Sequence, residues 1–187
     1  LADVSRRTKT FALLTQRALN GSFEPTAEDK ARYGFSSDGA FYTKRDIGTT
    51  AGFYSNVRPI GPKEIAKVWK LAALEPIMID IARSDTSISS IYFNSHDSYN
   101  LIYPYVDVIR QYPRRMAIPT YNFYYEADAA HNPRRVPVWT DAYVDPAGHG
   151  WMVSSIVPVW EGNSLEGVAG IDLTLDTVVN RLLDLHL

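Results

Sequence analysis

Three strand-like segments stand close together near the C-terminus, and they constrain the fold more than any other feature of the chain. They read VPVWTDAYVD, WMVSSIVPVW and LEGVAGIDLTL, and only the short turn sequences PAGHG and EGNS separate them. Strands joined by such short turns pair as antiparallel neighbours, because a parallel connection needs a long crossover. The sequence therefore predicts an antiparallel meander over residues 136–175.

The rest of the chain predicts helices around this meander. Two further β-like segments, SSIYFNS and NLIYPYVD, flank the polar residues 96–99 and predict a hairpin. Helical periodicity predicts helices at 3–20, at 62–83 with a kink at Pro76, within 121–133, and at 177–187. Residues 21–61 have little periodicity and are predicted to form a long, partly extended excursion.

These elements predict an α+β fold. We expect a central antiparallel sheet of about five strands, flanked by helices and preceded by a long N-terminal helix. In this interpretation residues 1–21 form the N-terminal helix and residues 22–187 form a single module. A chain of 187 residues is long enough to bury a core without covalent cross-links.

The composition excludes several classes of function. The chain carries 19 basic and 21 acidic residues, and this balance gives no electrostatic footprint for nucleic acid or for an anionic membrane. It has no cysteine, which excludes disulfides, thiolate zinc sites and a cysteine nucleophile. No apolar run reaches the ~20 residues that span a bilayer. The chain begins at Leu1 without a signal peptide, and we expect it to be a fragment of a longer protein.

No pattern in the sequence indicates catalysis or a cofactor. Glycine-rich phosphate loops and a GxSxG elbow are absent. Asp172 and Asp176 lie four residues apart, but Asp176 is expected to cap the last helix. The histidines lack metal-ligand spacing; they are His96, His131, His149 and His186. We therefore predict no catalytic residue, no metal site and no cofactor.

A series of motifs runs through the second half of the chain. An aromatic helix (FYYEAD) is followed by WTxxYxD, by a strand ending in proline and an aromatic residue, and by GVxGxD. These motifs occupy Phe123–Asp128, Trp139–Asp145, Pro158–Trp160 and Gly167–Asp172. Their order resembles the closing half of Cache domains, the PAS-like extracytoplasmic sensors of bacterial histidine kinases, chemoreceptors and related receptors. The helix at 62–83 followed by SSIYFNS also fits, so the resemblance covers residues 62–180.

The resemblance implies a ligand pocket between the sheet and the short helices and loops above it. The ligand-binding residues that it implies are Tyr121, Phe123, Tyr124, Trp139, Tyr143, Asp145 and Asp172. Each also has a purely structural interpretation. Asp145 can shape the turn after it, Asp172 can pair with an internal donor, and the aromatic residues can be ordinary core.

The residue types at these positions favour a cationic ligand. Two carboxylates beneath aromatic rings suit an ammonium group through charge pairing and cation–π contact. Amino-acid-binding members of the family carry an arginine two residues before the helix aromatic, where this chain has Tyr121 before Phe123. This departure argues against an α-amino acid and in favour of an amine or another neutral-to-cationic metabolite. The nearby arginines are expected to be solvated; they are Arg114, Arg115, Arg134 and Arg135.

The resemblance also implies a function and a location. It predicts an extracytoplasmic sensor at the periplasmic or extracellular face of the membrane, belonging to a signal-transduction receptor such as a histidine kinase. The membrane anchors would lie outside this chain, which would be the membrane-distal module of a tandem pair or a single module. A small-molecule ligand would shift populations and act on the terminal helices. The first helix, with Phe11, Leu14 and Ala18 on one face, either forms a homodimer with a second copy or packs on its own domain.

Three alternatives stay open at this point. The first is a cytoplasmic PAS-type regulatory domain, which would share the sheet without needing the long first helix. The second is an interaction module without a ligand, in which the aromatic residues are only core. The third is an enzyme that uses Asp172, but no base–nucleophile pair supports it, and we expect the chain not to be an enzyme.

Overall fold

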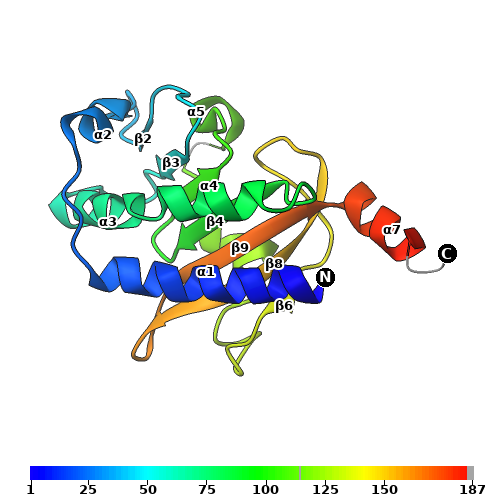
Figure 1. Cartoon of the computed structure of the whole chain (residues 1–187). Coiled ribbons are helices and arrows are strands. Elements are labelled where there is room, and N and C mark those ends of the chain that lie inside the picture. Colours follow the sequence, from blue (N-terminus) through cyan, green and yellow to red (C-terminus); the bar gives the residue numbers. More distant parts are fainter. Residues whose placement is uncertain (114, 185–187) are drawn as a thin grey trace.

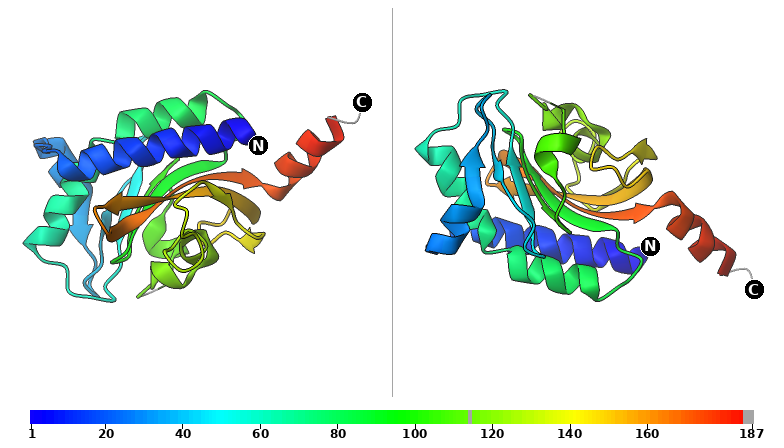
Figure 2. Two further views of the ribbon diagram at one scale, coloured as in Figure 1. Left: turned by 90° about the horizontal axis from the view of Figure 1, so that it is seen from below. Right: turned by 90° about the horizontal axis from the view of Figure 1, so that it is seen from above.

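A computed structural model describes residues 1–113 and 115–184, and its centre is an antiparallel sheet with helices on both faces (Figures 1 and 2). The strands are β1 (Tyr33–Phe35), β2 (Phe41–Thr43), β3 (Ala51–Tyr54), β4 (Ser90–Ser95), β5 (Tyr99–Tyr103), β6 (Val138–Trp139), β7 (Tyr143–Val144), β8 (Trp151–Glu161) and β9 (Ser164–Thr174). The helices are α1 (Ala2–Asn20), α2 (Ala27–Arg32), α3 (Pro62–Ala72), α4 (Glu75–Arg83), α5 (Val108–Gln111), the 3-10 helix η1 (Ile118–Thr120), α6 (Asn122–Tyr125) and α7 (Leu175–Asp184).

The expected α+β architecture is confirmed: an antiparallel sheet is flanked by helices and preceded by a long N-terminal helix. The described strands follow the order β1-β2-β3-β5-β4-β9-β8-β6, and β7 also pairs with β8. The helices α1, α3 and α4 cover one face of the sheet, and α5, η1, α6 and the loops around them cover the other (Figure 2). The sheet therefore separates two hydrophobic cores.

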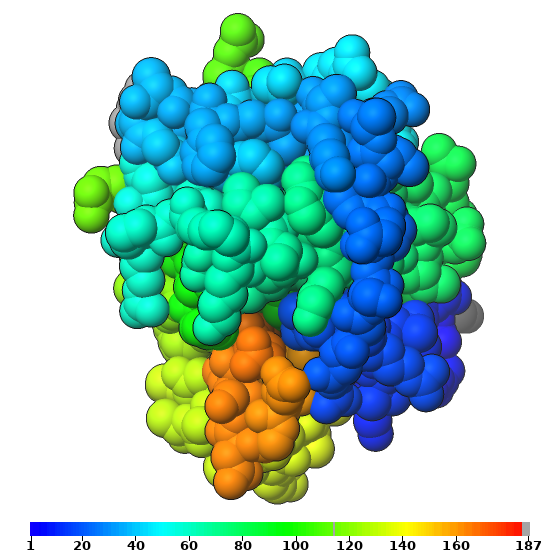
Figure 3. All heavy atoms as spheres, turned by 90° about the vertical axis from the view of Figure 1, so that its left-hand side faces the viewer, coloured from blue at the N-terminus to red at the C-terminus, as the bar shows by residue number. Residues whose placement is uncertain are grey.

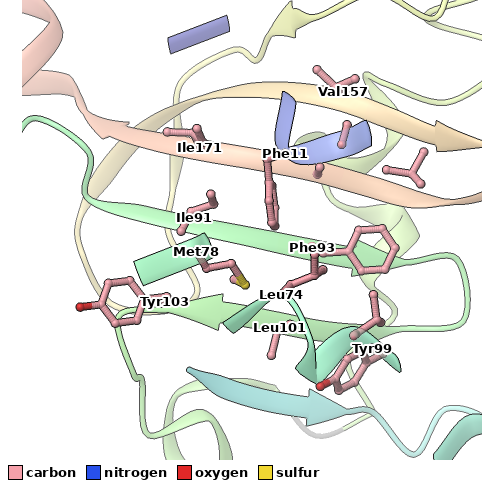
Figure 4. Close-up of a cluster of buried hydrophobic side chains, with 14 of the residues drawn as sticks. Phe11, Leu74, Met78, Ile91, Phe93, Tyr99, Leu101, Tyr103, Val157 and Ile171 are labelled. Atoms are coloured by element: carbon pink, nitrogen blue, oxygen red, sulfur yellow. The ribbon is translucent and has the colours of Figure 1, made fainter. Parts of the chain in front are cut away.

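Helix α1 packs on its own domain, against β8 and β9. Phe11 is fully buried in the core beneath this helix, near Met78, Phe93 and Ile171 (Figure 4). The sheet therefore covers the apolar face that could have paired with a second copy. Burial of this face on the sheet stabilises the domain, because it removes apolar surface from water. Leu13, on the outer side of α1, stays 53% exposed. The division of the chain at residue 21 stays a prediction.

Residues 21–61 are more regular than the sequence predicted. They form α2 and the strands β1, β2 and β3, which extend the sheet from about five strands to nine in the described part of the chain. These strands have three or four residues each, which is too short for an alternating pattern to stand out. In the view of Figure 3, most of this part of the chain (light blue and cyan) stands above α3 (teal), and the tip of the β8–β9 hairpin (orange) stands below α3.

A buried ion pair fastens this extension to the helical face. The guanidinium of Arg32, a residue only 4% exposed, lies 3.2 Å from the carboxylate of Glu75 in α4 and also donates to the carbonyl of Thr50 at 3.0 Å. A buried charge needs such partners, because it has given up its water. The pair therefore holds β3 against the start of α4.

The remaining differences from the predicted elements are local. The helix predicted at 62–83 breaks after Ala72, and Pro76 takes the second position of α4, where its missing N–H costs nothing. The predicted strand 136–145 is divided into the short strands β6 and β7, both paired to β8. Helix α7 begins at Leu175 rather than at residue 177, and the end predicted for it at 185–187 lies outside the described residues.

No helix in the described part of the chain combines the length and the hydropathy needed to cross a bilayer.

Candidate ligand-binding site

A cavity lies between the sheet and the lid, the name used here for the described residues of 108–150. The sheet contributes Tyr92, Asn94, Asn100, Ile102 and Asp172, and the lid contributes Tyr112, Met116, Phe123, Tyr143, Asp145 and Pro146. The cavity volume is about 20 Å³, which is the space of about one water molecule. The lid therefore fits closely against the sheet in this conformation.

Strand register decides which side chains reach the cavity. Along β4, Tyr92 and Asn94 face the lid, whereas Ile91 and Phe93 enter the core beneath α1. Pairing with β9 and β8 then places Asp172 on the same face, opposite Ser90 on one side and Ser154 on the other. Three separate strands thus bring polar side chains to one end of the cavity.

Asp172 is the central polar residue of the site, and it is 2% exposed. One carboxyl oxygen accepts a hydrogen bond from Ser90 at 2.6 Å. The other accepts from Ser154 at 2.6 Å and from Tyr143 at 3.3 Å. Burial, with a smaller contribution from the charge of Asp145, raises the pKa of Asp172 to about 7. This carboxyl group therefore changes its charge near neutral pH.

The internal donors around Asp172 are neutral hydroxyls. Sequence reasoning allowed an internal arginine or lysine as its partner, and the described hydrogen bonds and ion pairs of this carboxyl include neither. Hydroxyls satisfy the hydrogen bonds of a carboxylate without cancelling its charge.

Asp145 has both of the roles considered from the sequence: it shapes a turn and it lines the cavity. Its Oδ1 accepts from the backbone N–H of Ala147 at 2.9 Å, and its Oδ2 lies 2.6 Å from Nδ1 of His149. The residue is 8% exposed. The hydrogen bond with Asp145 raises the pKa of His149 despite the burial that opposes it. A carboxylate and a titratable imidazole are therefore joined at the edge of the cavity.

Tyr92 lies across β9 because the residue beneath it has no side chain. A Cβ atom on Gly170, its cross-strand partner, would stand 2.2 Å from Cζ of the tyrosine ring and 2.4 Å from its hydroxyl oxygen. Such a contact is impossible for any other residue type without displacing the ring. The second glycine of the GVxGxD motif thus makes room for an aromatic wall of the cavity.

A chain of neutral groups forms another polar part of the cavity wall. The amide of Asn100 donates to Oδ1 of Asn94 at 2.8 Å, and the hydroxyl of Tyr112 donates to Oδ1 of Asn100 at 2.9 Å. Burial raises the pKa of Tyr112 well above its usual range, so this phenol stays neutral. The cavity therefore has carboxyl groups in one part and neutral hydrogen-bonding groups in another.

Four of the seven residues implied by the resemblance line this cavity together: Phe123, Tyr143, Asp145 and Asp172. Tyr121 stacks behind Phe123, with ring centroids 5.1 Å apart, and does not line it. Tyr124 is buried in the same core but away from the cavity.

Trp139 lies on the other side of the sheet. Its indole N–H donates to the hydroxyl of Ser5 at 3.1 Å, and its ring packs against the core beneath α1. Because β6 pairs with β8 in the register that joins Trp139 to Ser155, the alternation of β6 turns this side chain away from the cavity. Its position corresponds to the core interpretation made from the sequence.

Sequence reasoning missed most of the sheet side of the cavity and half of the lid side. The residues not foreseen are Tyr92, Asn94, Asn100, Ile102, Tyr112, Met116 and Pro146. The alternation in SSIYFNS was a signal that Tyr92 and Asn94 share a face, but only the pairing with β9 shows which face that is. Arg115, Arg134 and Arg135 are exposed as expected, and Arg114 lies outside the described residues.

The arrangement is suited to binding a cation. The described lining residues include two aspartates and four aromatic rings, but neither lysine nor arginine. Within residues 1–113 and 115–184, no group of three or more histidine, cysteine, aspartate or glutamate side chains is placed to hold a metal ion.

Comparison with known proteins gives structural matches alone. No protein-family model matches the chain, and no curated protein does. The ligand-binding domain of the Pseudomonas fluorescens chemoreceptor CtaA with L-serine matches with a TM-score of 0.48 and 20% identity, over 59% of this chain and 44% of that one. The corresponding domain of PctB from Pseudomonas aeruginosa PAO1 with L-Gln matches with a TM-score of 0.44 and 18% identity, over 96% and 57%.

A third match has a similar extent. It is the ligand-binding domain of the Campylobacter jejuni chemoreceptor Tlp3 with L-norvaline, with a TM-score of 0.44 and 15% identity over 65% of this chain and 44% of that one. The chain thus spans about half the length of these solved domains, or less. All three are ligand-binding domains of bacterial chemoreceptors.

Proposed function

We propose that this chain is the extracytoplasmic ligand-sensing domain of a bacterial membrane receptor and that it binds a small amine in the cavity beneath the lid. The observation that carries the proposal is Asp172, a buried carboxyl group whose described partners are neutral hydroxyls. A cation beside it would remove the cost of burying its charge.

The other walls of the cavity support a cationic ligand. Asp145 adds a second carboxylate, and Phe123, Tyr143 and Tyr92 add aromatic surfaces. An ammonium group gains from carboxylates by charge pairing and from aromatic faces by cation–π contact. The combination is therefore more selective for an amine than either element alone.

The same cavity would be unfavourable for a ligand that carries a carboxylate. CtaA and PctB were solved with L-serine and L-Gln, which both carry a carboxylate. In this cavity such a group would lie among two aspartates, with no described lysine or arginine in the lining to hold it. We therefore propose an amine that lacks a carboxylate.

Binding would require the lid to move. A cavity of about 20 Å³ is too small for an amine of several heavy atoms, so the ligand would select a conformation with the lid further from the sheet. The lid includes β7, which pairs with β8 at Tyr143 and Val144. Displacement of the lid would thus act on the β8–β9 pair.

The terminal helix would receive this displacement. Asp172 is two residues before Thr174, whose hydroxyl accepts from the N–H of Thr177 at 3.2 Å and caps the start of α7. Arg181 of α7 also pairs with Asp85 at 3.1 Å. We propose that α7 passes the change to the output part of the receptor, a histidine kinase or chemoreceptor module anchored by segments outside this chain.

We propose a sensor rather than an enzyme. The imidazole of His149 adjoins the site through Asp145, and its described hydrogen bond goes to that carboxyl group instead of to a serine hydroxyl. A cytoplasmic regulatory domain and a module without a ligand are the competing functions. They differ from the proposal in the location of the receptor and in the result of the binding experiment.

A thermal-shift and calorimetry screen tests the proposal. The wild-type domain is measured against amines, amino acids and carboxylates, alongside Asp172→Asn and the control Asp176→Asn, which removes an exposed carboxylate four residues away. An amine at 100 times its dissociation constant should stabilise the wild type and the control by about 2.7 kcal/mol, and Asp172→Asn much less. Absence of any amine binding to the folded wild type would refute the proposed function.

A further inference from the structure

We infer that the hydroxyl oxygen of Tyr92 accepts a hydrogen bond from the ligand, which makes the ligand a primary amine rather than a quaternary ammonium compound. The inference rests on the proposed function and refines it by naming the class of amine. It depends on the geometry of Tyr92, a residue that the sequence motifs did not identify.

The hydroxyl of Tyr92 is a buried polar group that lacks a partner in the described part of the chain. The residue is 3% exposed, and its ring forms part of the cavity wall. Its oxygen makes no hydrogen bond of acceptable geometry with the described residues, although the hydroxyls of Ser154 and Tyr143 lie nearby. A buried hydroxyl without a partner is costly, and native proteins keep few of them.

The neighbouring hydroxyls are already engaged with other partners. The Ser154 hydroxyl donates to Asp172 at 2.6 Å, and the Tyr143 hydroxyl lies 2.7 Å from that of Ser154. These groups therefore satisfy each other and the carboxylate. The unused hydrogen-bonding capacity at this end of the cavity is concentrated on Tyr92.

The carboxylates of the cavity also have their donors. Asp172 accepts from three hydroxyls, and Asp145 is bonded to the Ala147 N–H and to His149, so each carboxyl group keeps acceptor capacity for a cation. An ammonium beside them gains charge pairing and has three N–H groups to place. The Tyr92 oxygen, which has no described partner, accepts one of these N–H groups, whereas a quaternary ammonium has none to offer and would leave this hydroxyl unsatisfied.

Gly170 keeps this oxygen at the site. The absence of a Cβ lets the end of the Tyr92 ring lie directly over the β9 backbone, two residues from Asp172 along the same face. Burial, followed by the charge of Asp172, raises the pKa of Tyr92 well above its usual range. The phenol is thus fixed in place and neutral, with a lone pair available.

The test combines one variant with a matched pair of ligands. Affinities of n-butylamine and of N,N,N-trimethylbutylammonium are measured by calorimetry for the wild type, for Tyr92→Phe and for the control Tyr124→Phe, which removes the hydroxyl of a buried tyrosine that does not line the cavity. We expect Tyr92→Phe to weaken n-butylamine binding about tenfold or more while leaving the quaternary compound unchanged. The control should change neither affinity.

A second readout separates ligand recognition from a structural role. Because Tyr92→Phe removes an unsatisfied hydroxyl, it should raise the melting temperature of the ligand-free domain while it weakens amine binding. A lower melting temperature, or equal effects on both ligands, would overturn the inference while leaving the proposed function intact. Failure of the wild type to bind any amine would instead refute the proposed function itself.

Discussion

Replacement of Asp172 by asparagine should make the domain more stable at high pH, although it removes a carboxylate with three hydrogen-bond donors. Asparagine has nearly the same shape and keeps one carbonyl oxygen as an acceptor on the side of Ser154 and Tyr143, while its NH2 group donates to the hydroxyl of Ser90, which can turn its own proton away. What it removes is the charge, which the wild-type protein must bury when the carboxyl group ionises.

The magnitude follows from the pKa of this group. Its ordinary value is 3.8, and in the folded domain it is about 7. Below pH 3.8 the carboxyl group is protonated in both the folded and the unfolded chain, so it contributes no penalty. Between pH 3.8 and 7 only the unfolded chain loses the proton, and the free energy of unfolding falls by about 1.4 kcal/mol per pH unit. Above pH 7 the loss is complete, at about 4 kcal/mol.

Urea denaturation of both proteins from pH 4 to pH 8.5, followed by tryptophan fluorescence, measures this difference. The other titrating groups are shared, so they cancel when the two stabilities are subtracted. We expect near-equal stability at pH 4 and an advantage for Asp172→Asn of about 4 kcal/mol at pH 8, equivalent to about 10 °C in melting temperature. A difference that stays constant across this pH range would refute the assignment of a raised pKa to Asp172.

Three further predictions follow from other parts of the structure. Amine affinity should rise with pH up to about 7, about tenfold per unit, because protonated Asp172 loses its attraction for a cation; calorimetry at pH 6 and 8 checks this, and Asp172→Asn should show a weaker dependence. Arg32→Met should lower the free energy of unfolding by about 3 kcal/mol in urea titrations, because it leaves Glu75 without its cation. Phe11→Ala should cost about 3–5 kcal/mol, whereas Leu13→Glu should stay within about 0.5 kcal/mol; a large loss at the second position, or a change in sedimentation, would reveal an interface on the outer side of α1.

The predictable part of the fold is the part with long, regular elements. The β4–β5 hairpin and the β8–β9 pair were predicted because each strand has at least five residues and a short turn joins them. The strands β1 to β3 were missed because three or four residues do not display a period. Their place in the sheet depends on tertiary contacts such as the pair between Arg32 and Glu75.

The site was predictable to a similar degree. The motifs identified Asp145 and Asp172, because these residues are the last positions of WTxxYxD and GVxGxD. Tyr92 was not identifiable, since its role depends on a glycine 78 residues later in the chain that lies across from it in the sheet. For Trp139 the sequence left a pocket position and a core position open, because two residues of β6 are not enough to show which way the strand alternates; the structure places it against the core beneath α1.

The side chains of β4 and β9 alternate strictly between the cavity face of the sheet and the face beneath α1. This alternation limits how the coding sequence of these strands can change in length. Loss or gain of a single codon within β9 would exchange the positions of Asp172 and Ile171, placing a carboxyl group beneath α1 and an aliphatic side chain in the cavity. Changes of two codons keep the faces but move Gly170 from under Tyr92. Length variation among homologous genes should therefore be confined to the turns, most readily to residues 146–150 and 162–163, and be absent from β8 and β9.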